Sequence, residues 1–103
     1  AASDVYKRQI KYGTAYMYLL QNRHLSAIAD PQSREYCAIA AYNIGTGGML
    51  RTFGKSRDAA FEAINAMTPE QVRNTLLKKL SSRETKAFLA KVLKSRERFS
   101  MLG

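Results

Sequence analysis

The chain has 103 residues, a length that indicates one domain or part of one. Hydrophobic residues make up 46% and charged residues 24%, which is typical of a folded globule rather than of a disordered chain. One cysteine, Cys37, and one histidine, His24, exclude an intrachain disulfide and a multi-cysteine zinc site, so we expect no metal and no cofactor. The formal net charge of +9 favours an anionic partner without specifying its kind.

Residues 1–9, AASDVYKRQ, resemble a peptide that arises when sequencing-adapter DNA is translated. We therefore expect a non-native leader at 1–9 and the protein's own sequence at 10–103, with its N-terminal part missing. The alternative is a genuine first helical turn. A first helix is predicted from about Tyr6 or Ile10 to Arg23, and its apolar positions, including Met17, Tyr18 and Leu20, are broad enough to face neighbours on more than one side.

The second predicted helix covers about 31–44, with Asp30 as its cap and Pro31 in its first turn. From Tyr36 onward it is almost wholly apolar, which predicts a position in the centre of the core. Cys37 is expected there as an inert buried thiol. The uncharged stretch 36–50 is too short and too rich in glycine to span a membrane, so no transmembrane segment is expected.

Glycines at 45, 47 and 48 end the second helix, and a short helical turn at 49–53 follows. Further helices are predicted at 57–67, 69–80 and 83–98. Thr68, Pro69 and Gln71 form a strong start signal for the second of these, and the spacing of Ser81 and Glu84 predicts a capping box for the last. Nothing alternates like a half-buried strand, so the predicted fold is all-α, packed around a common core: Tyr36, Ile39, Ala40, Leu76, Phe88 and Val92.

Tyr42 and Asn43 carry the most informative chemistry, because they stand near the end of a buried helix just before the glycine turn. A buried phenol or carboxamide needs a hydrogen-bond partner, and leaving it unpaired costs about 1–3 kcal/mol. The pair therefore forms either a local structural network or the polar wall of a cleft. Gly45 and Gly47 allow a ligand to approach closely, although a plain helix stop explains them equally well.

Three motifs in this order resemble the family 1 (SLT-type) lytic transglycosylases, which cleave bacterial peptidoglycan. The segment 41–47 is similar to the A-Y-N-x-G-x-G motif, 12–16 to the G-T-x-Y helix, and 82–92 to the closing E-[ST]-[RK]-x-[YF]-[LV]-x-K-V segment. The resemblance covers about 10–99. It implies the C-terminal portion of a lysozyme-like helical domain.

The family acts on glycan strands of alternating N-acetylmuramic acid and N-acetylglucosamine and leaves 1,6-anhydro ends. By this resemblance Tyr42 would orient the catalytic Glu, Asn43 would line the cleft, and the turn at Gly45 and Gly47 would shape its floor. Apart from the resemblance, the ring of Tyr16 or Tyr12 could stack on a sugar of the glycan, although aromatic residues in a helix more often pack in the core. The resemblance also implies a periplasmic, outer-membrane-associated parent protein, and we expect a monomer.

The chain differs from the family in the catalytic residue. The catalytic Glu of the family lies several tens of residues before the G-T-x-Y helix, and nothing here matches it. The candidate carboxylates stand at positions that the family does not use for catalysis: Glu35, Asp58, Glu62, Glu70, Glu84 and Glu97. Phe88 replaces a common Tyr. We therefore expect no catalytic residue in this chain and no cleavage by it alone.

Two other classes of function remain open at this point. A small basic all-α module could bind nucleic acid or another polyanion, but it would need Lys and Arg gathered on one face, whereas here they are dispersed. It also leaves the 42–48 sequence unexplained, so no nucleic acid partner is expected. A helix bundle acting as a scaffold is the third interpretation.

Overall fold

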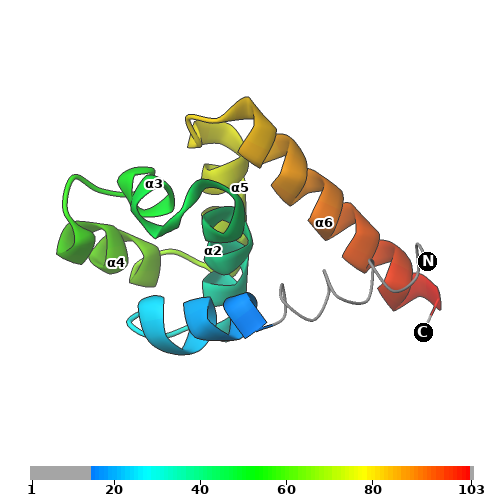
Figure 1. The fold of residues 1–103 in the computed structure, drawn as a ribbon, viewed down its shortest axis with the longest axis horizontal. Helices are drawn as coiled ribbons and strands as arrows, with labels where there is room; N and C mark the ends of the chain where they lie inside the picture. Colours follow the sequence, from blue (N-terminus) through cyan, green and yellow to red (C-terminus); the bar gives the residue numbers. More distant parts are fainter. Residues whose placement is uncertain (1–14, 103) are drawn as a thin grey trace.

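The computed structural model describes the backbone of residues 15–102 and the side chains of 15–95 (Figure 1). Every regular element in this part of the chain is a helix, as predicted. A helical turn at 15–19 leads into the others in chain order: η1 (Leu20–His24), α2 (Pro31–Ile44), α3 (Thr46–Arg51), α4 (Arg57–Asn65), α5 (Pro69–Lys79) and α6 (Arg83–Leu102). No helix of the described residues is long and apolar enough to cross a bilayer.

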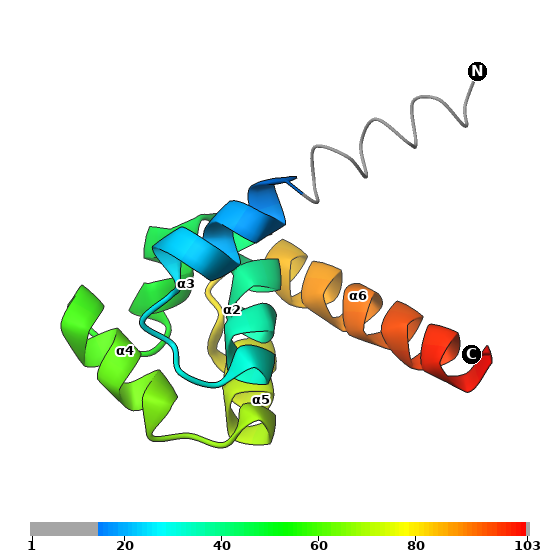
Figure 2. The ribbon, with the colours of Figure 1, turned by 90° about the horizontal axis from the view of Figure 1, so that it is seen from below.

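Helix α2 is the centre of the fold, as its apolar sequence predicts. It begins where Asp30 Oδ1 accepts a hydrogen bond from the Ser33 amide at 2.9 Å, with Pro31 in the first turn. Its residues 37–41 are all buried, and it contacts η1, α3, α5 and α6. Figures 1 and 2 show α2 in the middle of the bundle, with α3 and α4 on one side and α6 projecting away on the other.

The first helix ends differently from the prediction. The sequence pattern predicts a regular helix to Arg23, but 20–24 form a wider π-turn in which the Leu25 amide donates to the Leu20 carbonyl at 2.8 Å. Residues five apart lie about 140° apart around a regular α-helix. The wider turn reduces that separation, and both Leu20 and Leu25 are fully buried. Tyr18, predicted to face a neighbour, is instead 67% exposed.

The starts of α5 and α6 test the cap predictions. The capping box of α5 is confirmed: Thr68 Oγ1 accepts from the Gln71 amide at 3.2 Å, and the Thr68 amide donates to Gln71 Oε1 at 2.9 Å. The predicted Ser81 cap of α6 is wrong. Ser82 Oγ accepts from the Thr85 amide at 3.1 Å, because Ser82 directly precedes the first helical residue.

Helix α4 ends at Asn65, two residues before its predicted end, and the Asn65 side chain bonds to a distant loop. Asn65 Nδ2 donates to the Ala27 carbonyl at 3.0 Å, and Asn65 Oδ1 accepts from the Ala29 amide at 2.9 Å. These two bonds fasten the end of α4 to the connection between η1 and α2.

Three of the six predicted core residues are buried, and the other three lie at the margin of the core. Ile39, Ala40 and Leu76 are at most 4% exposed, whereas Tyr36, Phe88 and Val92 are half-buried and pack against the core from its margin. Phe88 and Val92 belong to α6, which projects beyond the bundle (Figure 2), and neither side chain is fully covered.

Candidate functional site

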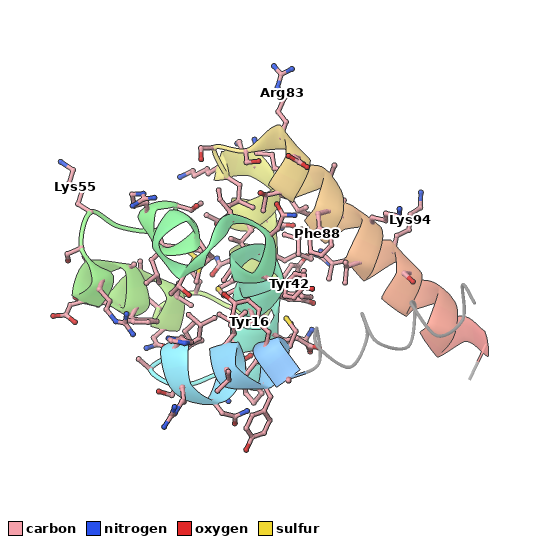
Figure 3. All side chains as sticks on the ribbon, viewed as in Figure 1. Tyr16, Tyr42, Lys55, Arg83, Phe88 and Lys94 are labelled. Atoms are coloured by element: carbon pink, nitrogen blue, oxygen red, sulfur yellow. The ribbon has the colours of Figure 1, made fainter. Side chains whose placement is uncertain are left out.

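Tyr42 stands two residues before the end of α2 and is 42% exposed. Its ring centroid lies 5.6 Å from that of Tyr16, with the planes tilted by 55°, and 6.1 Å from that of Phe88, with the planes within 16°. The three rings come from three helices, as Figure 3 shows. The fold thus brings Tyr16 and Tyr42, predicted as separate site residues, onto one surface. Phe88 joins them, although the sequence pattern predicted it in the core.

A hollow of about 180 Å³ opens beside Tyr42. Its lining is entirely apolar and comes from three parts of the fold: Met17, Ile39, Tyr42, Phe88 and Val92. Aromatic rings with an apolar floor and a phenol at the edge can take the flat apolar face of a ring while the hydroxyl stays in water. We call this surface the aromatic hollow.

Asn43 is held by a residue that the sequence analysis did not single out as a site residue. Thr85 is buried in the otherwise exposed first turn of α6, and its Oγ1 donates to Asn43 Oδ1 at 2.7 Å. The Asn43 side chain is exposed, and because its oxygen accepts from Thr85, its amide hydrogens remain as donors. The signal for Thr85 was present in the 82–92 motif, but only the fold shows that the hydroxyl reaches α2.

The glycine turn requires its glycines for two reasons. Gly45 has φ 92° and ψ 155°, a conformation essentially confined to glycine, and it both ends α2 and precedes α3. A Cβ at Gly48 would lie 2.9 Å from Ile44 Cγ1, so the chain needs a small residue there. Gly47 is exposed on α3 and lines a different hollow from Tyr42. The predicted site residues Tyr42 and Gly47, on either side of the turn, therefore line two different hollows.

The carboxylates lie away from the aromatic hollow. Glu35 is half-buried, and the other carboxylates with described side chains are exposed. None of them lines the hollow: Asp30, Asp58, Glu62, Glu70 and Glu84. The side chain of Glu97 and the whole of Tyr12 lie outside the described residues. Among the residues that the structure describes, no three or more His, Cys, Asp or Glu cluster in a way that could hold a metal ion.

Cys37 is buried, as its place on an apolar helix predicts. Burial raises the pKa of the Cys37 thiol to about 12, so it stays protonated at neutral pH and is a poor nucleophile. His24 is exposed, and its backbone carbonyl accepts a hydrogen bond from the Arg57 side chain at 3.1 Å.

The curated proteins that the chain resembles include several with the same name. The chain is 44% identical over 86 residues to membrane-bound lytic murein transglycosylase C of Sodalis glossinidius, 43% identical over 86 residues to that of Pectobacterium atrosepticum, and 39% identical over 90 residues to that of Haemophilus influenzae. These alignments cover 84–87% of this chain and 24–25% of each relative, so the chain spans about a quarter of the length of the relatives it matches. No protein-family model matches the chain.

The identities extend over most of the chain rather than over one motif, and the helices match the all-α prediction. By sequence the chain therefore resembles the lytic murein transglycosylases, as the homologue of a segment that makes up about a quarter of each C-type protein.

Proposed function

We propose that this segment forms part of the glycan-binding cleft of a peptidoglycan lytic transglycosylase. The complete enzyme would cleave the bond between N-acetylmuramic acid and N-acetylglucosamine without water and leave 1,6-anhydromuramoyl ends. The observation that carries the proposal is the aromatic hollow, where the rings of Tyr16 and Tyr42 meet at 5.6 Å beside an apolar floor. The names of the relatives support murein as the polymer.

Each site residue has a separate role in this proposal. Tyr16 and Phe88 offer ring faces to a sugar, and the amide hydrogens of Asn43 donate to an oxygen of the strand. The Tyr42 hydroxyl orients a catalytic Glu supplied from outside this chain. Such a Glu must protonate the leaving oxygen and then remove a hydroxyl proton, which requires an apolar surround that raises its pKa. The aromatic hollow supplies one side of that surround.

The parent protein would act at the outer membrane, on its periplasmic side, as the words "membrane-bound" and "murein" in the relatives' names suggest. The polymer is the only partner that the proposal requires, and the chain would act as a monomer.

This chain alone is expected not to cleave peptidoglycan. Incubation with purified sacculi, followed by mass spectrometry, should detect no 1,6-anhydromuropeptides. Products that disappear on Glu35→Gln or Glu62→Gln would contradict the assignment of roles, since these carboxylates do not line the hollow. In a protein with the upstream segment restored, Tyr42→Phe should lower turnover far more than stability. A stability loss of about 1–3 kcal/mol with turnover intact would instead make Tyr42 structural.

Binding can be tested on the chain as it is. Sacculi should retain it better than duplex DNA does at the same low salt concentration, and Tyr42→Ala should weaken the retention. Equal or stronger retention on DNA, with a steep dependence on salt, would favour a basic module that binds nucleic acid. The net charge of +9 makes this control necessary.

A further inference from the structure

Two further hollows lie against α3, beyond the glycine turn. One, of about 330 Å³, is lined by α3, the loop after it and the start of α4: Thr46, Gly47, Leu50, Arg51, Gly54, Lys55, Ser56 and Arg57. The other, of about 280 Å³, lies between α3 and the end of α5: Ile44, Gly48, Arg51, Thr52, Lys79 and Ser81. Arg51 lines both, so the two hollows are neighbours.

The charge of these hollows is of one sign. Arg51, Lys55 and Arg57 line the larger one, and Arg51 and Lys79 the smaller, while no described Asp or Glu lines either. Hydroxyl groups stand among the cations at Thr46 and Ser56. The aromatic hollow, by contrast, has no charged lining residue. Part of the positive charge of the chain is therefore gathered around these two hollows rather than dispersed over the solvated surface.

Internal contacts account for only one of these cations. Arg57 Nη2 donates to the His24 carbonyl at 3.1 Å, and its guanidinium lies 5.3 Å from the centre of the Phe61 ring. Within the described residues, the side chains of Arg51, Lys55 and Lys79 form no hydrogen bond or ion pair. Arg51 and Lys79 end helices, where positive charge is favourable, but Lys55 lies in a loop. Helix stability therefore does not explain Lys55.

We propose that the hollow of Arg51, Lys55 and Arg57 binds the carboxylates of the peptide stems that murein carries on its glycan strand. This inference rests on the proposed function. An arginine guanidinium matches a carboxylate with two parallel hydrogen bonds, and the hollow at about 330 Å³ is larger than a single small anion needs. Thr46, which lines it, follows the Tyr42–Gly45 segment directly in the chain. One strand could thus lay its sugars on the aromatic hollow and its stem on α3.

The chain offers matched controls for the test. Figure 3 shows Lys55 and Lys94 extending into solvent at opposite ends of the molecule, and Arg83 extending outward from the start of α6. Lys55→Gln is therefore paired with Lys94→Gln, and Arg51→Gln with Arg83→Gln, so that each pair removes one charge of the same type. Circular dichroism and thermal unfolding verify that each variant keeps its fold.

The measurement is an NMR titration of the full chain, at low ionic strength, with a synthetic stem tetrapeptide, L-Ala-γ-D-Glu-diaminopimelate-D-Ala. We expect Lys55→Gln and Arg51→Gln to raise the Kd roughly two- to fivefold, as exposed charge pairs do, and both controls to leave it unchanged. A second ligand is the same tetrapeptide with its carboxylates amidated. Its Kd for the native chain should be at least as high as the Kd of the unmodified tetrapeptide for the Lys55→Gln and Arg51→Gln variants.

Three outcomes would overturn the proposal. These are no binding of the tetrapeptide by the native chain, an equal loss in variants and controls, and equally tight binding of inorganic phosphate at the same ionic strength. Retention on sacculi that depends on Tyr42 separates this inference from the proposed function. If that retention persists while the tetrapeptide does not bind, only the stem site fails; if retention fails as well, the function fails.

Discussion

The aromatic hollow and the basic hollow, as we call the larger hollow against α3, differ in the physical properties that recognition uses. The first is apolar, presents ring faces and has no charged lining residue. The second is lined by Arg51, Lys55 and Arg57. Contact with ring faces is nearly independent of salt, whereas attraction between exposed charges is screened over about 10 Å at 0.1 M salt. The molecule therefore presents two separate means of holding a strand that has both sugars and carboxylates.

The comparison depends first on the turn that joins the two surfaces. Gly45→Ala should destabilise the chain by about 1–3 kcal/mol, because φ 92° with ψ 155° strains any residue that has a Cβ. Urea unfolding followed by circular dichroism measures this loss. Gly47→Ala is the matched control, since its Cβ would meet only Arg51 Nη1 at an ordinary 3.6 Å, so no loss is expected. Equal losses in both variants would show that the backbone conformation at Gly45 is not the cause.

Both surfaces also rely on α2 as a rigid support, and Cys37 reports on it. Burial raises the pKa of this thiol from 9.0 to about 12, so the folded state keeps a proton that the unfolded state loses. The free energy of unfolding should therefore fall as pH rises above 9, with a contribution from Cys37 of up to about 1.4 kcal/mol per pH unit. The difference between the native chain and Cys37→Ala, measured from pH 8 to pH 10.5, isolates this contribution. Parallel pH profiles would mean that the thiol is accessible in the folded state.

On the aromatic side, the bond from Thr85 to Asn43 links α6 to α2. Thr85→Val removes the hydroxyl while keeping the shape and should cost about 0.5–1.5 kcal/mol. Thr85→Ser should restore most of this loss. The positioning role makes a second prediction, that retention on sacculi falls in Thr85→Val and returns in Thr85→Ser. A stability loss without any change in retention would make the bond purely structural.

The smallest expected effect is the most direct test of the comparison. Tyr42→Ala should weaken retention on sacculi to a similar degree at 20 mM and 300 mM salt. Lys55→Gln should weaken it roughly twofold at 20 mM and leave it unchanged at 300 mM, because salt screens an exposed charge. Lys94→Gln is the control for net charge. The same salt dependence in the Tyr42 and Lys55 variants would contradict the division into two surfaces.

Local signals in the sequence were sufficient to predict most of the helices. Asp30-Pro31 and Thr68-Pro69 mark helix starts because the cap and the proline act within one turn, and the observed α2 and α5 begin as predicted. The wide turn at Leu20–His24 was not predictable in this way. It lets Leu20 and Leu25 reach the same core, and that requirement arises only when α2 is in place.

The candidate site also has features that local sequence determines and features that only tertiary packing determines. The sequence by itself determined that Tyr42, Asn43 and Gly45 stand together at the end of a buried helix, because neighbours in sequence stay neighbours in space. Only the tertiary structure placed Tyr16 and Phe88 against Tyr42 and joined Thr85 to Asn43 across 42 residues. Those contacts depend on how α6 and the first helix pack against α2, and packing between distant helices is set by the whole core rather than by any local pattern.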